Sequence, residues 1–231
     1  MSDAQATYTG LDVLQALDRA ANYNSLLLDL ILQSAQGRQR MLDFGAGIGT
    51  FSKLLRRKEV NVICVEPDLY LADGLTRDGF LTVKGLNEVP DDSFEFIFAL
   101  NVLEHIEDDQ VALCNLSAKL QKGGRLLVYV PAFKCLWTSM DDKLKHFRRY
   151  RRADLEQLAR SSGLSVWKTR YADSLGFFAA LIFKILGNKS GDLSRRALSL
   201  YDRYIVPASR RLDVVFGPLF GKNVYLVANK N

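Results

Sequence analysis

The 231-residue sequence has few cysteines, few histidines and no long apolar run, and each shortage excludes a class of protein. Its three cysteines, Cys64, Cys114 and Cys135, are an odd number, lack the close spacing of a zinc site and stand among apolar residues. We expect them to be reduced core thiols of a cytoplasmic protein. No stretch approaches the roughly 18 uninterrupted apolar residues of a membrane span. The first ten residues lack the basic and apolar regions of a signal peptide, and neither repeats nor low-complexity segments occur.

The overall composition is that of a globular protein, but the charge is unevenly distributed. Hydrophobic residues make up 48% and charged residues 25%, so we expect one domain with some elaboration. Residues 1–140 hold 13 Lys and Arg against 18 Asp and Glu (13 − 18 = −5), whereas residues 141–231 hold 18 against 8 (18 − 8 = +10). This asymmetry suggests an anionic partner: a phosphorylated substrate, a membrane surface or RNA. The alternative is a solvated basic surface.

Residues 40–52 predict a strand, a tight turn and a helix. A short apolar run, Met41 to Phe44, contains Asp43 and leads into a turn of small residues: Gly45, Ala46, Gly47 and Gly49. Glycine accepts positive φ and lets a ligand lie against bare backbone, and the first N–H groups of a helix favour an anionic group. The segment therefore predicts a nucleotide-type site, the alternative being an ordinary strand-to-helix turn.

The spacing of the glycines and of the next acidic residue indicates which class of nucleotide cofactor the turn binds. The dinucleotide pattern G-x-G-x-x-G would need glycine where the sequence has Thr50. The next apolar run ends at Glu66 and Pro67, so a carboxylate stands at the strand tip, where it can accept both hydroxyls of a ribose. Asp43, the alternate glycines and Glu66 together resemble the class I S-adenosylmethionine-dependent methyltransferases. The resemblance implies that the glycines hold the methionine end of S-adenosyl-L-methionine and that Glu66 holds its ribose.

The remaining pattern fits the doubly wound α/β fold that the resemblance implies. We expect a seven-stranded Rossmann-like sheet with an antiparallel last strand, in a single domain over 1–231. Further strands are expected over 80–83, 94–99, 125–130, 166–171 and 223–229, and helices over 11–36, 69–77, 108–120 and 153–162. The segment 1–37 would form helices that cover the cofactor. Within it, Tyr23 can reach the site or be core, and Leu86 with Asn87 take the position that relatives use near adenine.

Asn101 to His105 lies just beyond the strand expected over 94–99, where doubly wound folds bind ligands. We assign Asn101 to the cofactor. His105 can serve as a general base for a hydroxyl near pH 7, or can bond to backbone and shape the pocket. The pattern also resembles metal-assisted ubiquinone-pathway and small-RNA 2′-O-methyltransferases, in which Glu-x-x-Glu-His supplies ligands. Asn101 replaces the first glutamate, and because losing one carboxylate weakens a Mg²⁺ site, we predict no metal.

The loop after the strand expected over 125–130 carries a compact charged and aromatic cluster. Members of the family usually contact the acceptor from this region, and D…H-x-RRY resembles a bacterial subgroup associated with glycan or lipid-linked glycan assembly. Arginine pairs bidentately with phosphate or carboxylate, and a histidine here can hold or deprotonate a substrate oxygen. The alternative is a solvated basic turn. His105 and His146 are rival bases, and the predicted acceptor contacts are Tyr23, Asp141, Arg148, Arg149 and Tyr150.

About fifty residues, 172–222, separate the last two expected strands, and we predict a helical insertion or lid there. Its first part, LGFFAALIFKILG, is apolar on nearly every face, and its second, LSRRALSLYDRYIVPASRRL, is amphipathic. Such helices can lie in a membrane interface or cover an amphiphilic acceptor. They can equally pack on themselves or on a second subunit, so monomer and homodimer both stay open.

The sequence therefore predicts an S-adenosylmethionine-dependent methyltransferase that methylates oxygen on a small or lipid-linked anionic acceptor at the cytoplasmic membrane face. An RNA methyltransferase is the second hypothesis, although no separate RNA-binding module is evident. A cofactor-binding partner protein without catalysis is the third.

Overall fold

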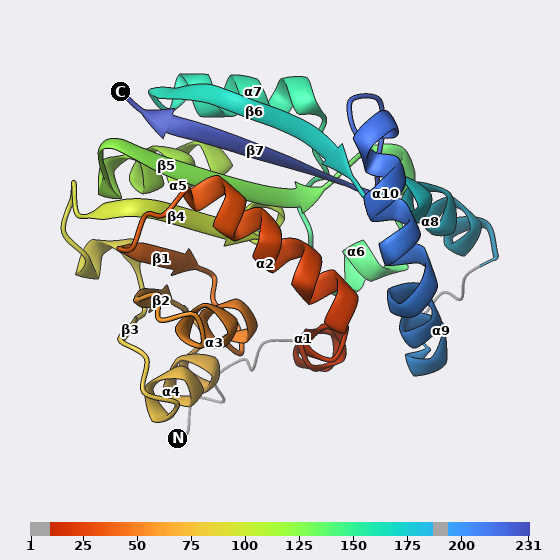
Figure 1. Ribbon diagram of the computed structural model, residues 1–231, viewed down its shortest axis with the longest axis horizontal. Helices are drawn as coiled ribbons and strands as arrows, with labels where there is room; N and C mark the ends of the chain where they lie inside the picture. Colours follow the sequence, from red (N-terminus) through yellow and green to blue (C-terminus); the bar gives the residue numbers. More distant parts are fainter. Residues whose placement is uncertain (1–9, 187–193) are drawn as a thin grey trace.

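The computed structural model describes residues 10–186 and 194–231. Seven strands form one sheet in the order β3-β2-β1-β4-β5-β7-β6 (Figure 1). Their bounds are β1 Met41–Phe44, β2 Val62–Val65, β3 Thr82–Val83, β4 Phe94–Leu100, β5 Leu120–Pro131, β6 Leu164–Ala172 and β7 Asn223–Lys230. β1 to β5 pair in parallel, and β7 runs antiparallel to both β5 and β6. The expected seven-stranded Rossmann-like sheet with an antiparallel last strand is confirmed.

Helices cover both faces of the sheet because successive strand residues point to opposite sides. In β4, Phe96 and Phe98 are buried in the cluster that includes Leu27 and Ile31 of α2 (Ala21–Ala35). Ile97 is buried on the other side with residues of α5 and α7. Figure 1 shows α2 and α3 in front of the sheet and α5 and α7 behind it. The helices that follow strands are α3 Thr50–Arg56, α4 Leu69–Arg77, α5 Asp109–Lys119 and α7 Arg152–Ser161, and the short turns are η1 Leu86–Glu88, η2 Leu103–His105, η3 Lys134–Leu136 and α6 Ser139–Lys143.

The single helix predicted over 11–36 is two helices, α1 (Leu11–Asp18) and α2. The side-chain amide of Asn24 donates to the carbonyls of Leu17 at 3.0 Å and Asp18 at 2.9 Å. These carbonyls end α1, where the N–H of Ala20 also donates to the carbonyl of Leu17 at 2.9 Å, so the buried amide stabilises the break. The third strand is also shorter than predicted and the fifth is longer. Phe80 packs beneath α4 against Leu75 instead of extending β3.

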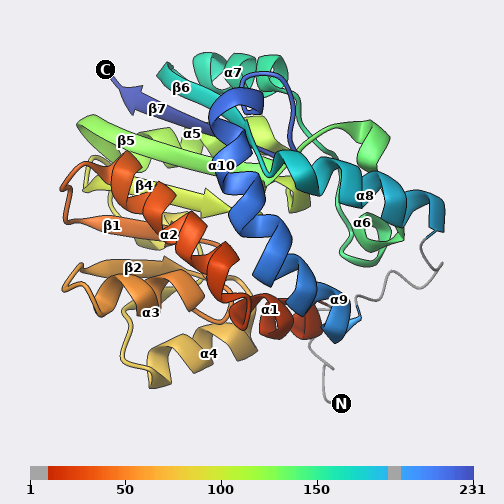
Figure 2. The ribbon, with the colours of Figure 1, turned by 45° about the vertical axis from the view of Figure 1, so that its right-hand side comes forward.

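The insertion predicted over 172–222 is helical in its described part. It contains α8 (Ser174–Leu186), α9 (Arg195–Leu200), the π-helical turn η4 (Tyr201–Ile205) and α10 (Val206–Phe216). Figure 2 shows these helices grouped with α1 and α6 at the end of the sheet toward which β1, β4 and β5 run. The insertion therefore stands over the carboxyl edge of the sheet. Residues 187–193 of it, and residues 1–9 of the predicted cap segment, lie outside the described residues.

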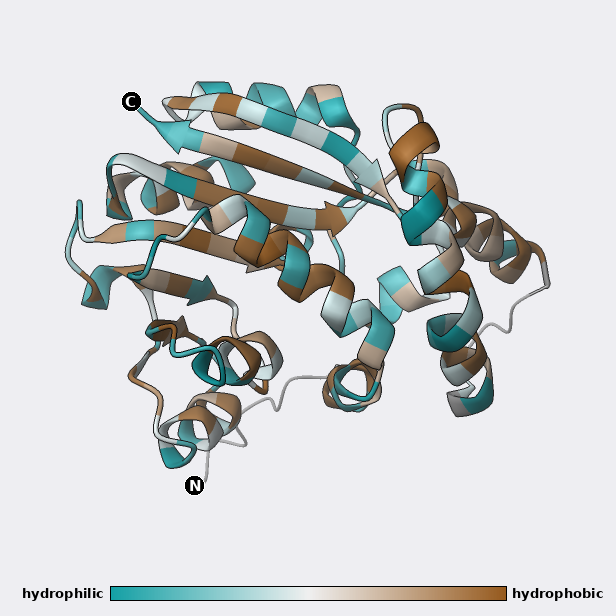
Figure 3. Ribbon diagram, in the orientation of Figure 1, coloured by the Kyte–Doolittle hydropathy of each residue, from teal (hydrophilic) through white to brown (hydrophobic). Residues whose placement is uncertain are grey.

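Apolar residues are concentrated in the central strands and along α8 (Figure 3). Among the residues that the structure describes, no helix has the length and hydropathy to cross a bilayer. The prediction that all three cysteines are core thiols is wrong for two of them. Cys64 is buried, but Cys114 and Cys135 are exposed. Cys114 lies on the solvent side of α5, whose buried face is formed by neighbouring leucines, and Cys135 lies in η3.

Candidate active site

At two glycines of the turn between β1 and α3, a neighbouring side chain lies too close to leave room for a Cβ atom. A Cβ at Gly45 would lie 2.5 Å from Cγ2 of Val102, and one at Gly49 would lie 2.5 Å from Cδ2 of Leu75. Both glycines also have positive φ, +76° and +79°. Space and backbone conformation therefore both require glycine, and the backbone of the turn stays bare at the carboxyl edge of the sheet.

Glu66 fastens this turn from the end of β2. Its Oε2 accepts the N–H of Gly47 at 2.7 Å, and its Oε1 accepts the N–H of Asp68 at 2.9 Å. Burial raises the pKa of the Glu66 carboxyl. Leu14 of α1 lies 3.4 Å from the place of a Cβ at Gly47, so α1 covers the turn as a predicted cap helix would. The predicted ribose-binding acid and the predicted cofactor turn are thus in direct contact.

Asp43 supports the turn from within the protein. It is buried, and its Oδ2 accepts the hydroxyl of Ser52 at 2.7 Å. Burial raises the pKa of Asp43 to about 7, which the Ser52 hydrogen bond opposes and the charge of Glu66 reinforces. The N–H of Ala46 donates to the carbonyl of Val65 at 3.1 Å. Asp43 and Ala46 therefore tie α3, β1 and β2 together, and their contact with the cofactor stays a prediction.

Leu86 and Asn87, predicted near adenine, lie in the loop after β3, and Pro67, predicted to contact the cofactor, lies in the loop after β2. Leu86, in η1, packs against the core cluster that contains α5, whereas Pro67 and Asn87 are exposed. Since β2 and β3 are neighbouring parallel strands, both loops open at the edge that carries the glycine turn. Their contact with adenine stays a prediction.

Asn101 and Tyr23 meet at the end of β4. Asn101 has φ +54°, and its N–H donates to the carbonyl of Tyr129 at 2.7 Å. Its side-chain Nδ2 points to the hydroxyl of Tyr23, on α2, at 3.4 Å. Burial raises the pKa of Tyr23 to about 12. The structure thus brings together a residue predicted for the cofactor and one predicted for the acceptor.

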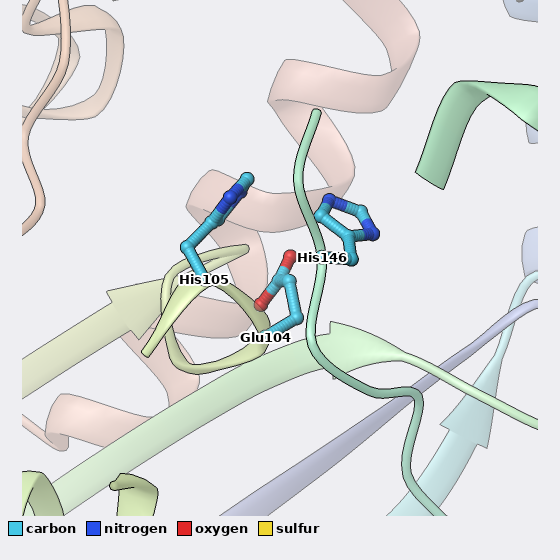
Figure 4. Close-up of side chains that lie close together, drawn as sticks. All are labelled: Glu104, His105 and His146. Atoms are coloured by element: carbon cyan, nitrogen blue, oxygen red, sulfur yellow. The ribbon is translucent and has the colours of Figure 1, made fainter. Parts of the chain in front are cut away.

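Both histidines lie together beside a buried glutamate. The rings of His105, in η2, and His146, in the loop after α6, pack edge to face with centroids 4.6 Å apart. Glu104 lies between them (Figure 4), and one ligand atom from each of the three residues falls within 4.8 Å of the others. Burial raises the pKa of Glu104 to about 8. Burial, with the charge of His146, lowers the pKa of His105 to about 4.

Asp141 holds the loop that carries His146. Its carboxylate accepts Nδ1 of His146 at 2.9 Å, and Nε and Nη2 of Arg149 at 2.8 and 2.9 Å. Burial acts to raise the pKa of Asp141, but the hydrogen bonds from His146 and Arg149 outweigh it and hold the pKa well below its usual range. The guanidinium of Arg149 is therefore occupied by a bidentate internal pair, and its predicted contact with the acceptor stays a prediction.

Arg148 and Tyr150 fasten the same loop to α5. Arg148 pairs with Asp109 at 2.9 Å and also donates to the carbonyl of Glu107. The hydroxyl of buried Tyr150 donates to Oδ2 of Asp109 at 2.8 Å. The cluster predicted from D…H-x-RRY is therefore compact, and its arginines are bonded to other residues of the chain. A direct role of Arg148 and Tyr150 toward the acceptor stays a prediction.

A second polar group at the same edge, not predicted from the sequence, is made by Asp173, Tyr201 and Lys222. Asp173 directly follows β6 with φ +63°, and its carboxylate accepts the hydroxyl of Tyr201, in η4. Nζ of Lys222 lies 4.9 Å from the centroid of the Tyr201 ring. Burial lowers the pKa of Lys222, an effect that the charge of Asp173 opposes. No spacing motif marks these residues; the one available signal is that Asp173 and Lys222 flank the insertion at the ends of adjacent strands.

The bare glycine turn, the adjacent carboxylate of Glu66 and the cover supplied by α1 fit a nucleotide-type cofactor. The comparisons with known proteins agree. A family model described as a methyltransferase domain matches residues 16–169. No curated protein sequence matches the chain.

Solved structures with the same fold include three methyltransferases. A geranyl diphosphate C-methyltransferase from Streptomyces coelicolor, in complex with Mg²⁺, geranyl diphosphate and S-adenosylhomocysteine, has a TM-score of 0.62 and 13% identity, over 90% of this chain and 77% of that one. A methyltransferase from Archaeoglobus fulgidus has a TM-score of 0.58 and 16% identity, over 90% and 94%. Phosphoethanolamine N-methyltransferase 2 from Haemonchus contortus, in complex with S-adenosylmethionine, has a TM-score of 0.58 and 18% identity, over 90% and 52%.

The family model covers well over half of the chain, and the cofactor turn lies within the matched residues. S-adenosylmethionine is accordingly the cofactor, and the chain belongs to the methyltransferase domain family as a class I S-adenosylmethionine-dependent methyltransferase.

Proposed function

We propose that this methyltransferase transfers a methyl group to an oxygen of a small or lipid-linked anionic acceptor at the cytoplasmic face of a membrane. The observation that carries the proposal is the insertion over the carboxyl edge of the sheet. It places an apolar helix surface next to a polar site that contains both histidines and the partly buried Lys222. An acceptor with an apolar part and an anionic head matches both features.

Lys222 is the cation best placed to pair with an anionic head group. Arg148 and Arg149 are both engaged by carboxylates, whereas Nζ of Lys222 meets the face of an aromatic ring. A desolvated ammonium with its pKa lowered by burial gains from an added anionic partner. We therefore add Lys222 to Arg148 and Arg149 as a proposed anion-binding residue.

The support for membrane contact is a row of exposed apolar side chains on α8. Phe178, Ile182 and Ile185 are spaced by four and three positions, so they share one face of the helix. Ile182 is 58% and Ile185 78% exposed. A membrane interface would bury this row, and the net positive charge of residues 141–231 favours anionic lipids.

In the proposed reaction, bound S-adenosylmethionine supplies a methyl group activated on its sulfonium. The glycine turn and Glu66 hold the cofactor, and Lys222 orients the acceptor. Nδ1 of His105 donates to the carbonyl of Leu144 at 3.0 Å, and Nδ1 of His146 donates to Asp141. In the neutral form of each ring Nε2 carries the lone pair, so Nε2 is the atom that accepts the proton of the acceptor hydroxyl.

Flotation of the full-length protein with vesicles tests the membrane part of the proposal. We expect binding to anionic phospholipid vesicles, little binding to neutral ones, and loss of binding in the double variant Ile182→Asp, Ile185→Asp. The control is Leu81→Asp, which changes an equally exposed apolar residue beside β3, 65% exposed and away from the insertion. Equal flotation of the α8 variant and the wild type would overturn the membrane assignment.

Methyl-labelled cofactor and a membrane lipid extract test the acceptor class in the same samples. We expect label in the lipid fraction, and at least a tenfold loss in Lys222→Met. Label found in aqueous metabolites or RNA instead would contradict a lipid-linked acceptor.

A further inference from the structure

The buried carboxyl group of Glu104 has one oxygen that makes no hydrogen bond. Glu104 is 1% exposed, and its Oε2 is buried without a hydrogen-bond partner. A carboxylate oxygen buried in this way is costly unless something compensates it. In Figure 4 the carboxylate of Glu104 points into the space between His105 and His146. The carboxylate that carries the unpaired atom thus faces two imidazole rings.

In both rings Nδ1 is engaged by a hydrogen bond to another part of the chain. Nδ1 of His105 donates to the carbonyl of Leu144, which belongs to the loop that also carries His146. Nδ1 of His146 donates to the carboxylate of Asp141, and Arg149 in turn holds that carboxylate. Metal-binding histidines in proteins are typically oriented by such a bond from the other nitrogen to a carbonyl or carboxylate. Each Nε2 is therefore left with a lone pair for a ligand.

We propose that Glu104, His105 and His146 bind one divalent transition-metal ion of the Zn²⁺ type. Two imidazoles and one carboxylate form a ligand set that proteins use for zinc with a position left open, whereas Mg²⁺ prefers oxygen ligands. Metal–ligand distances of about 2.0–2.2 Å place the donors of one ion up to about 4 Å apart. The donors here lie within 4.8 Å of one another, so small side-chain rotations complete the set.

This inference reverses the prediction of no metal. That prediction considered the consecutive pattern in which Asn101 replaces a carboxylate, and it did not include His146. The loop after β5 brings His146 to the position where a third ligand is needed. With a metal bound, both Nε2 atoms are ligands and no longer act as a base. The open coordination position would then accept an oxygen of the acceptor, whose proton passes to solvent, a role that rests on the proposed O-methylation. The metal binding itself does not depend on that role.

Metal titration of the untagged, chelator-treated protein tests the site. Since the chain has two histidines, any imidazole ligation must come from His105 or His146. The exposed thiols of Cys114 and Cys135 are alkylated first, so that they do not bind the probe metals. We expect one Co²⁺ per chain with a four-coordinate visible spectrum, displacement by Zn²⁺, and shifts of both histidine ¹⁵Nε2 signals in NMR spectra.

Variants distinguish the proposed ligand residues from residues that only position them or lie nearby. Glu104→Gln, which keeps the side-chain shape, is expected to weaken Zn²⁺ binding at least 100-fold, whereas the exposed neighbour Glu107→Gln leaves it unchanged. Asp141→Asn, which removes a positioning residue, should weaken Zn²⁺ binding about 10- to 100-fold. Unchanged histidine signals at saturating Zn²⁺, or wild-type affinity in Glu104→Gln, would overturn the proposal. Binding of S-adenosylhomocysteine, measured in parallel by calorimetry, reports on the cofactor site separately.

Discussion

At the scale of single residues, the buried carboxyl of Asp43 makes the stability of the protein depend on pH. Burial raises the pKa of Asp43 to about 7, above its value of 3.8 in the unfolded chain. The folded state therefore binds the proton more tightly, so this contribution is fully present below pH 3.8 and is lost as the pH rises toward 7. In the ligand-free protein the loss amounts to at most about 4 kcal/mol.

The variant Asp43→Asn removes this titration while keeping an oxygen for the Ser52 hydroxyl. We expect its free energy of unfolding, measured by urea denaturation, to rise relative to the wild type between pH 4 and pH 7. The difference should level off above pH 8. A difference that does not change with pH would show that Asp43 titrates normally in the folded protein.

Gly49 shows how one residue combines backbone and packing requirements. In Gly49→Ala, positive φ costs about 1–2 kcal/mol, and the new Cβ would collide with Leu75, whose buried side chain has little room to move. Gly163→Ala is the matched control, because Gly163 has φ +77° but no atom within 4 Å of its Cβ position. We expect the conformational cost to lower the free energy of unfolding of both variants. Only Gly49→Ala should also bind S-adenosylhomocysteine at least tenfold more weakly, as measured by calorimetry. Equal cofactor affinity in the two variants would show that this turn does not contribute to cofactor binding.

At the scale of elements, the insertion is fastened to the cap helix α2. The carboxylate of Asp202, in η4, accepts the N–H groups of Asn22 at 3.2 Å and Tyr23 at 2.9 Å. It thereby caps the first turn of α2 from a segment far along the chain, a function that a residue just before a helix usually performs. Arg210 of α10 pairs with Asp29 of α2 at 2.6 Å. Two contacts thus join α2 and the insertion.

Replacing Asp202 is expected to destabilise both α2 and the insertion. Because Asp202→Ala leaves two N–H groups of α2 without their acceptor, it should lower the free energy of unfolding by about 1–2 kcal/mol. Asp29→Asn is the control, since it breaks an exposed ion pair worth less than about 1 kcal/mol. Urea denaturation measures both, and amide hydrogen exchange at Tyr23 should quicken only in Asp202→Ala. An equal loss in the two variants would exclude a capping role.

At the scale of the whole molecule, the cofactor site and the insertion lie in parts of the chain with opposite net charge. The glycine turn and Glu66 lie in the half with net charge −5, whereas the insertion lies in the half with net charge +10. Since attraction to anionic lipid is screened by salt, the vesicle binding proposed above should weaken as ionic strength rises. Binding that is independent of salt would assign it to the apolar row of α8 alone.

The sequence by itself determined the features that depend on local order. Short apolar runs and the glycine turn predicted the sheet, and the position of Glu66 at the end of β2 predicted an acid at the cofactor site, whose contact with the ribose stays a prediction. The exposure of Cys114 and Cys135 was not predicted, because an apolar neighbourhood in sequence does not say which face of a helix is buried. The break at Asp18 was missed for a similar reason, since the amide that stabilises it belongs to the next helix.

Only the tertiary structure decided which charged groups are free and which are paired. Arg148 and Arg149 looked available in sequence, yet Asp109 and Asp141 occupy them after folding. Lys222 carries no motif, but the sheet places it beside Tyr201 of the insertion. Likewise the two histidines, from loops that follow different strands, meet around Glu104. Local sequence sets backbone preferences over a few residues, whereas the partner of a side chain depends on which loops the sheet brings to one edge.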